Sequence, residues 1–224
     1  MTPAAIGQGT PRRLPRAILF DWDNTLVESW GVIHEALNLT LGAMGHPHWT
    51  REETEKRVRA SLRDSFPGLF GARWREAEQV FYNSFAAIHL THLRPLPGAG
   101  EMLAHLAGQG LYLGVISNKR GEYLRREADH LGWTGHFRAL AGAGDAARDK
   151  PAIEHVQLAL GDLPRNSDVW LVGDADIDLQ CATNAGCTPV LMRSAAPGEG
   201  EFPGHEPTLY FPDCAGLLAY LRQP

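Results

Sequence analysis

Short apolar runs separated by helical stretches constrain the fold of this 224-residue chain more than any other feature. Each run is apolar on both faces, as expected for a strand buried in a parallel sheet. The runs are Ala17–Phe20, Leu111–Ile116, Ala139–Ala141, Val169–Val172, Val190–Met192 and Leu209–Phe211. Helix-like periodicity lies between them at Glu101–Gly108, Gly121–Leu131, Pro151–Leu160 and Asp178–Ala185. The alternation predicts an α/β fold with a doubly wound, Rossmann-like parallel sheet and right-handed crossovers.

The spacing between the first two runs is too long for a single crossover. About ninety residues separate Phe20 from Leu111, whereas a crossover needs about a dozen. Helical periodicity fills the gap at Trp30–Met44, Arg51–Leu62 and Arg73–Leu93. We therefore expect a flexible tail at residues 1–15, an α/β core at residues 16–29 and 95–224, and an inserted helical subdomain at residues 30–94.

Charge and composition exclude several classes of protein. The net charge is −5 and the basic residues are scattered, which argues against nucleic acid and an anionic membrane surface as partners. No apolar run approaches the length of a membrane span. Arg12, Arg13 and Arg16 form a basic run, but the apolar stretch that follows is too short for an export signal.

The three cysteines, Cys181, Cys187 and Cys214, show no C-x-x-C pattern. They are typical of buried or incidental thiols and not of a disulfide framework or a zinc site. Together with the absence of an export signal, this predicts a cytoplasmic location.

Polar residues follow the apolar runs where ligands bind in open α/β sheets, beyond the carboxyl ends of the strands. The first run is followed by Asp21-Trp22-Asp23-Asn24-Thr25, the second by Ser117-Asn118-Lys119, and the fourth by the segment Gly173–Asp178. Lys150 precedes Pro151 at the start of a predicted helix. One edge of the sheet is therefore expected to gather several carboxylates and a lysine.

Carboxylates so close together repel one another, and a hard divalent cation relieves the repulsion. Mg²⁺ takes oxygen ligands and commonly uses one or two carboxylates together with a substrate phosphate. The expected ligands are Asp21, Asp174 and a backbone carbonyl near Asp23. Ser117, the amide of Asn118 and the Lys150 ammonium are candidates to hold the remaining phosphate oxygens.

These segments resemble the motifs of the haloacid dehalogenase superfamily. Asp21-Trp22-Asp23-Asn24-Thr25-Leu26 is similar to the first motif, D-x-D-x-T-L/V, and Val115–Lys119 is similar to the second. Lys150-Pro151 resembles the third motif, and Gly173-Asp174 through Asp178 resembles the fourth, G-D-x-x-x-D. The helical insert resembles the α-helical cap of the phosphoglycolate phosphatase and beta-phosphoglucomutase branch.

The resemblance implies a role for each matching residue. Asp21 is similar to the nucleophile that becomes phosphorylated. Asp23 is similar to the general acid and base, with its backbone carbonyl on the metal. Asp174 corresponds to the metal-binding carboxylate, and Asp178 to an outer or water-mediated partner of the Mg²⁺ site. Ser117 and Lys150 would stabilise the transferring phosphoryl group, and Lys150 would also hold Asp21 in place.

The resemblance also implies a reaction. Dehalogenases of the superfamily lack an acid at the position of Asp23, because a halide leaves without a proton, so Asp23 favours phosphoryl transfer. We expect a Mg²⁺-dependent phosphatase acting on a small phosphorylated metabolite such as phosphoglycolate, as a monomer or a homodimer. A phosphomutase of the beta-phosphoglucomutase type, a nucleotidase or sugar phosphatase, and an inactive metal-and-phosphate-binding module remain alternatives.

The insert contains one further candidate. Ser61–Gly68 is rich in hydrogen-bonding groups and is predicted to form a polar turn. In capped relatives the cap contributes the pocket for the leaving group, so Arg63 is a candidate to meet a substrate carboxylate or hydroxyl. The alternative is an exposed loop arginine with no such role.

Overall fold

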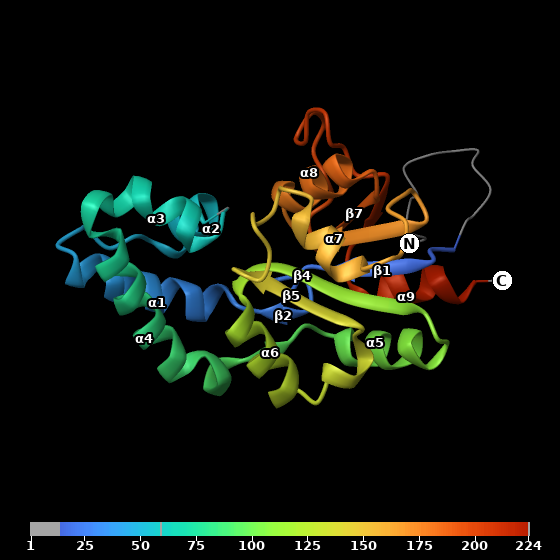
Figure 1. Ribbon diagram of the computed structural model, residues 1–224, viewed down its shortest axis with the longest axis horizontal. Helices are drawn as coiled ribbons and strands as arrows, with labels where there is room; N and C mark the ends of the chain where they lie inside the picture. The colour runs from blue at the N-terminus through green and yellow to red at the C-terminus, as the bar shows by residue number, and fades with distance from the viewer. Residues whose placement is uncertain (1–13, 59, 224) are drawn as a thin grey trace. The chain divides into compact units, whose positions relative to one another are not determined.

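The computed structural model describes residues 14–58 and 60–223 (Figure 1). The chain divides into two compact units: a core unit, with the chain up to Val27 and from Pro95 onward, and a helical unit, Glu28–Arg94. The predicted tail at residues 1–15, including Arg12 and Arg13, lies outside the described residues except for Leu14 and Pro15.

The core unit contains a six-stranded sheet in the order β5-β4-β1-β6-β7-β8. All five pairings between neighbouring strands are parallel. The strands are β1 (Ala17–Phe20), β4 (Tyr112–Arg120), β5 (Ala139–Ala143), β6 (Val169–Gly173), β7 (Thr188–Met192) and β8 (Leu209–Phe211). Two short strands, β2 (Val27–Glu28) and β3 (Arg94–Pro95), pair separately. The predicted doubly wound α/β fold is confirmed.

The order of the strands reverses at β1, since β4 and β5 follow on one side and β6 to β8 on the other. Phe20 is level with Val115 of β4 and with Val172 of β6. The Asp21 backbone N–H continues the ladder by donating to the Val172 carbonyl at 2.8 Å. The residues that follow β1 and β6 therefore meet at the switch point, where open α/β sheets bind ligands.

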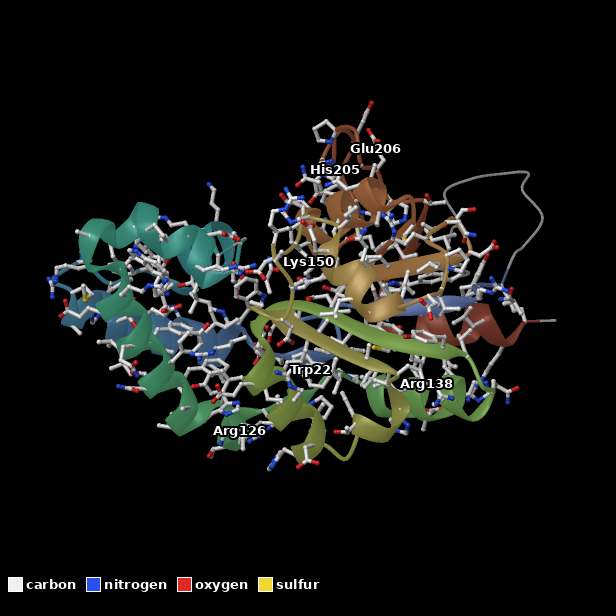
Figure 2. All side chains as sticks on the ribbon, viewed as in Figure 1. Trp22, Arg126, Arg138, Lys150, His205 and Glu206 are labelled. Atoms are coloured by element: carbon white, nitrogen blue, oxygen red, sulfur yellow. The ribbon has the colours of Figure 1, made fainter. Side chains whose placement is uncertain are left out.

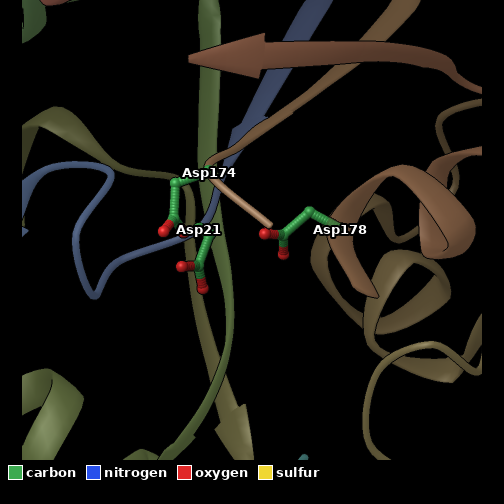
Figure 3. Close-up of side chains that lie close together, drawn as sticks. All are labelled: Asp21, Asp174 and Asp178. Atoms are coloured by element: carbon green, nitrogen blue, oxygen red, sulfur yellow. The ribbon is translucent and has the colours of Figure 1, made fainter. Parts of the chain in front are cut away.

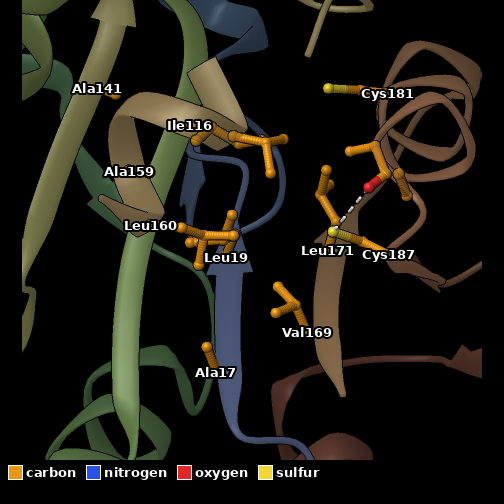
Figure 4. Packing of buried hydrophobic residues seen from close by; sticks show 13 residues of the cluster. Ala17, Leu19, Ile116, Ala141, Ala159, Leu160, Val169, Leu171, Cys181 and Cys187 are labelled. Carbon is orange, nitrogen blue, oxygen red and sulfur yellow. Dashed lines mark hydrogen bonds between the residues drawn. The ribbon is translucent and has the colours of Figure 1, made fainter. Parts of the chain in front are cut away.

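Helices cover both faces of this sheet (Figure 1). The helices α7 (Glu154–Leu160) and α8 (Asp176–Ala185) pack on one face, and α5 (Ala99–Gly108), α6 (Gly121–His130) and α9 (Cys214–Arg222) pack on the other. Leu19 of β1 and Leu171 of β6 lie in the apolar cluster under α7 and α8 (Figure 4). A short 3₁₀ turn, Thr134–His136, follows α6. Strands apolar on both faces are thus buried on both faces, which holds their polar carboxyl ends in fixed positions.

The helical unit is built from α1 (Trp30–Ala43), α2 (Arg51–Arg57), α3 (Leu62–Phe70) and α4 (Trp74–His92), with a 3₁₀ turn at Gly71–Arg73. Helix α4 packs against α1 and α3. Aromatic rings take part in the contact with α3: Phe66 of α3 is edge-on to Phe81 of α4, at 5.9 Å between ring centroids. Phe66 is also edge-on to Phe70 within α3, at 4.9 Å. These contacts give the insert an apolar core of its own.

Two predictions inside the insert are wrong. The helix expected at Arg51–Leu62 ends at Arg57, and the expected polar turn at Ser61–Gly68 lies mostly within α3. Ser61 has extended backbone angles, and its carbonyl accepts the N–H groups of the next turn, including that of Ser65 at 3.0 Å. Burial of Phe66 and Phe70, four residues apart on one face, stabilises the helix despite Pro67.

Within residues 14–58 and 60–223, none of the helices is long and apolar enough to cross a membrane. The cytoplasmic location stays a prediction. Cys181, Cys187 and Cys214 are buried free thiols, which confirms the prediction from their spacing. Burial raises the pKa of the Cys181 thiol to about 12, so the reactive thiolate is disfavoured.

Candidate active site

Three carboxylates converge at the switch point of the sheet (Figure 3). Asp21 follows β1, Asp174 follows β6, and Asp178 lies in the first turn of α8. Each offers an oxygen, and these oxygens all lie within 4.8 Å of one another. Asp21 and Asp178 are 7% and 1% exposed, so the carboxylates are close together and largely withdrawn from water.

Lys150 supplies a positive charge to this cluster from the segment between β5 and α7 (Figure 2). Its Nζ lies 2.7 Å from Asp21 Oδ1 and 2.7 Å from Asp178 Oδ1. The side chain is 2% exposed, and a buried ammonium needs such partners. The contact between Lys150 and Asp21 is the one that the family resemblance implies.

One ammonium faces three carboxylates, and burial together with the neighbouring carboxylates raises the pKa of Asp21 and of Asp174. Burial raises the pKa of Asp21 to about 7, with Asp178 and Asp23 adding to the rise and Lys150 opposing it. Burial, Asp178 and Asp21 raise the pKa of Asp174 well above its usual 3.8. Carboxylate oxygens gathered in this way are suitable ligands for a hard divalent cation. The cluster can therefore hold a metal ion.

Asp178 is fixed by the start of its own helix. Asp178 Oδ1 is paired with Lys150, and Asp178 Oδ2 accepts the Ala175 N–H at 3.2 Å. A Cβ on Gly173 would lie only 2.3 Å from Asp178 atoms, so this approach requires glycine. Asp174 Oδ1 accepts a longer bond, 3.4 Å, from the Thr25 hydroxyl. With both Asp178 oxygens engaged, Asp21 and Asp174 are better placed to contact a cation directly.

The strand that leads into the second motif is longer than the apolar run Leu111–Ile116 predicted. Strand β4 continues through Ser117, Asn118 and Lys119 to Arg120, because Arg120 pairs with Ala143 of β5 after a register shift. Ser117 is 1% exposed, and its hydroxyl oxygen accepts the Lys119 N–H at 3.1 Å. The motif therefore lies on an irregular strand end and not on a loop.

Asn118 has a contact that the sequence did not predict. Its side-chain amide donates to the Lys150 carbonyl at 3.1 Å and accepts the Lys150 N–H at 3.0 Å. Both backbone groups of Lys150 are thus held by one side chain. Asn118 therefore holds in place the backbone from which the Lys150 ammonium reaches Asp21.

Two further residues contact the first motif and were not among the predicted site residues. Lys119 Nζ lies 2.6 Å from Asp23 Oδ1 and 2.6 Å from Glu127 Oε2. Glu127 is buried on α6 beside Tyr123 and Leu124. The sequence did contain an indication of this contact. Glu127 occupies a position in α6 where the helical periodicity predicts a buried apolar residue, and a buried carboxylate needs a charged or hydrogen-bonding partner.

Arg63 is the second residue of α3 and belongs to the helical unit. Its predicted contact with a substrate stays a prediction. The core unit, by contrast, brings oxygens of Asp21, Asp174 and Asp178 within 4.8 Å of one another and places Lys150 in contact with Asp21 and Asp178. It also links Asn118 to Lys150 and Asp23 to Lys119.

Known proteins match this chain over most of its length. The family model for haloacid dehalogenase-like hydrolases matches residues 18–192. A phosphoglycolate phosphatase from Aquifex aeolicus is 28% identical over 180 residues, which are 79% of this chain and 84% of that protein. A 5'-nucleotidase from Pseudomonas aeruginosa is 28% identical over 211 residues, 92% of this chain and 95% of that protein.

A solved structure agrees with the fold. A hydrolase of the haloacid dehalogenase-like family from Streptococcus pneumoniae has a TM-score of 0.80 at 21% identity, covering 93% of this chain and 99% of that one. At this identity the likeness concerns the fold alone. The family model therefore gives the family, and the structural match agrees with it in fold.

Proposed function

This chain belongs to the haloacid dehalogenase-like hydrolase family, and we propose that it is a Mg²⁺-dependent phosphatase of small phosphomonoesters that works through an aspartyl phosphate on Asp21. Phosphoglycolate is the first candidate substrate. The phosphoglycolate phosphatase from Aquifex aeolicus, with 84% of its length matched, supports that choice.

One observation carries the proposal: Asp21, Asp174 and Asp178 present oxygens within 4.8 Å of one another, with the Lys150 ammonium in contact with two of them. A structural ion pair would balance its charges, whereas this cluster keeps an excess of negative charge. Such an arrangement is typical of a site that binds a cation and a phosphoryl group together.

In the first half of the proposed reaction, the Asp21 carboxylate oxygen forms a bond to phosphorus while the bond from phosphorus to the leaving oxygen breaks. Asp23 gives its proton to the leaving oxygen, which departs as an alcohol. Lys150 orients Asp21, and the Ser117 hydroxyl donates to a phosphoryl oxygen. The backbone carbonyl of Asp23 and the carboxylates of Asp21 and Asp174 are the proposed ligands of Mg²⁺, with Asp178 outside them.

In the second half, a water oxygen forms a bond to the phosphorus of the aspartyl phosphate, and the bond from phosphorus to Asp21 breaks. Asp23, now a carboxylate, takes a proton from that water. Orthophosphate leaves, and Asp21 is free again while Asp23 is protonated as at the start. Bound Mg²⁺ would supply charge neutralisation at the phosphoryl oxygens.

A nucleotidase is a second candidate, favoured by the 5'-nucleotidase from Pseudomonas aeruginosa, which matches over 92% of this chain. The same residues would perform the chemistry in both cases, because the leaving group does not change the steps at phosphorus. The two candidates differ only in the group that must be recognised beyond the phosphate. They are therefore separated by substrate and not by mechanism.

The deciding experiment is a phosphate-release screen with Mg²⁺ over phosphoglycolate, sugar phosphates and nucleoside monophosphates, run beside Asp21→Asn. We expect orthophosphate from at least one class, and a loss of about a thousandfold or more in Asp21→Asn, because its amide cannot form the acyl phosphate. Circular dichroism should show that the variant is folded. Retained turnover in Asp21→Asn would show that Asp21 is not the nucleophile. A wild-type protein that is active only when a sugar bisphosphate is added would be a phosphomutase.

A further inference from the structure

Lys119 lies between two carboxylates that come from different elements of the core unit. Its Nζ is 2.6 Å from Asp23 Oδ1, in the turn after β1, and 2.6 Å from Glu127 Oε2, on α6. Lys119 itself lies near the end of β4. The ammonium thus links the proposed general acid and base to a helix that contributes nothing else to the proposed reaction.

Of the three side chains in this contact, those of Lys119 and Glu127 are buried, whereas that of Asp23 is partly exposed to water. The side chains of Lys119 and Glu127 are 5% and 1% exposed, whereas that of Asp23 is 19% exposed. Burial alone would lower the pKa of Lys119, but attraction to Asp23 and Glu127 outweighs it and raises that pKa. A charged ammonium with no water around it makes strong, directional bonds to its carboxylates.

The buried Glu127 carboxylate is also held by an aromatic side chain, that of Trp22, which is labelled in Figure 2. Trp22 Nε1 donates to Glu127 Oε2, the oxygen that Lys119 also contacts, at 2.7 Å. The Trp22 ring is fully buried and packs edge-on against Trp133 and Phe137, at 5.9 Å and 6.4 Å between ring centroids. Glu127 is therefore held in one orientation, and Lys119 is held by Glu127.

We infer that Lys119, supported by Glu127 and Trp22, is a positioning residue that orients the Asp23 carboxyl group for proton transfer to the leaving oxygen. The contact uses Asp23 Oδ1, which leaves Oδ2 for the substrate. This inference rests on the proposed phosphatase function. General acid catalysis requires the acid to lie within hydrogen-bonding distance of the leaving oxygen, and a carboxyl group free to rotate would meet that condition only part of the time.

The alternative is a purely structural ion pair, in which Lys119 only neutralises buried Glu127. The two roles predict different effects of a Lys119 substitution on substrates with different leaving groups. An alkyl phosphate such as phosphoglycolate needs a proton at its leaving oxygen, whereas 4-nitrophenyl phosphate releases a stable phenolate without one. Because kcat/KM covers only the steps up to release of the first product, it isolates the step in which Asp23 acts as an acid.

The test is to measure kcat/KM of Lys119→Met with Mg²⁺ on phosphoglycolate, or on the best alkyl phosphate of the screen, and on 4-nitrophenyl phosphate. We expect a drop of about thirtyfold or more for the alkyl phosphate and of less than about fivefold for the aryl phosphate, within the range of general acid catalysis. Arg125→Met is the matched control, because it removes another ion pair of α6, the one with Asp145. In Arg125→Met, any change in kcat/KM should be the same for the alkyl and the aryl phosphate.

Lys119→Met leaves Glu127 buried without its ammonium and could unfold. The double variant Lys119→Met/Glu127→Gln removes that charge and is expected to be folded by circular dichroism, with the same selective loss on the alkyl phosphate. An equal loss on both substrates, or no loss, in a folded variant would overturn the positioning role while the phosphatase function stood. A wild-type protein inactive on both substrates would overturn the proposed function itself.

Discussion

At the scale of single residues, the site depends on how its charged side chains are held. Lys150 is the clearest case, since its ammonium contacts Asp21 and Asp178 while its backbone is held by Asn118. A long flexible side chain has many rotamers, and fixing it costs about 2 kcal/mol of conformational entropy. Contacts at both ends of the residue offset part of that cost before a substrate binds.

This argument predicts that Asn118→Ala lowers turnover without removing any charge from the site. With both backbone bonds of Lys150 lost, the ammonium is less well placed, and kcat should fall about ten- to a hundredfold. Asn184→Ala is the matched control, because Asn184 makes one bond, of 2.9 Å, to the carbonyl of the adjacent Pro151. Steady-state kinetics of the two variants provide the check, and equal activity in both would contradict the role of Asn118.

Arg63 is the predicted contact for a substrate carboxylate or hydroxyl, and its removal should affect substrates selectively. Arg63→Ala is expected to raise KM for phosphoglycolate about tenfold, roughly the energy of one charge-assisted hydrogen bond. KM for ethyl phosphate, which has neither a carboxylate nor a hydroxyl, should change little. Arg73→Ala removes an arginine that pairs with Glu76 on the surface and serves as the control. Unchanged KM and kcat on both substrates would end this role for Arg63.

Sequence alone predicted the charged residues of the site better than the contacts that hold them. Asp21, Asp174 and Lys150 could be placed together because parallel strands end at one edge of the sheet. The bonds from Asn118 to the Lys150 backbone could not be predicted, because they span 32 residues and depend on an irregular strand end. The contact of Lys119 with Glu127 likewise depends on how α6 is rotated against β4.

At the scale of the elements, the buried strands were predictable and helix α3 was not. Strands such as β6 are short runs of apolar residues on both faces, bounded by polar residues, and their length favours a buried strand over a buried helix. Helix α3 was missed because its polar first turn and Pro67 are typical of a loop. Part of its stability comes from the tertiary contact of Phe66 with Phe81 of α4, which local sequence does not reveal.

The turn from β6 into α8 gives a prediction at this scale. Gly173→Ala would bring a methyl group to 2.3 Å from Asp178, and so would force the start of α8 away from the strand. We expect a loss of activity of about a hundredfold or more and a lower Tm, because Asp178 then loses its contact with Lys150. Activity assays and thermal unfolding provide the check.

Gly108→Ala is the control for that change. It lies at the end of α5, and a Cβ there meets nothing within 4 Å. The substitution should leave activity unchanged and stabilise the protein slightly, by less than about 1 kcal/mol. If Gly173→Ala were fully active, the backbone at the end of β6 would have to shift to accept the methyl group without disturbing Asp178. The contacts of Asp178 would then matter less for activity than we expect.

At the scale of the whole molecule, the proposed metal site would couple the folding of the core unit to ion binding. Asp21 and Lys150 are 129 residues apart in the chain, so the carboxylate cluster exists only when several strands have assembled. In the native state the pKa of Asp21 is about 7, against 3.8 for an ordinary aspartate. The native state therefore holds more protons than the unfolded chain between these values, and this group makes metal-free protein less stable as pH rises through that window.

A bound cation should reverse that trend, because it favours the ionised carboxylates. We therefore expect MgCl₂ at about a hundred times its Kd to raise Tm by about 5 °C or more at pH 8, and by much less at pH 5.5, where Asp21 is protonated. Differential scanning calorimetry against NaCl of equal ionic strength measures the difference. Asp174→Asn should lose the magnesium-dependent gain while its metal-free Tm stays equal or rises, since one repelling carboxylate is gone. An equal gain at both pH values, or an undiminished gain in Asp174→Asn, would place the cation outside the cluster of Asp21, Asp174 and Asp178.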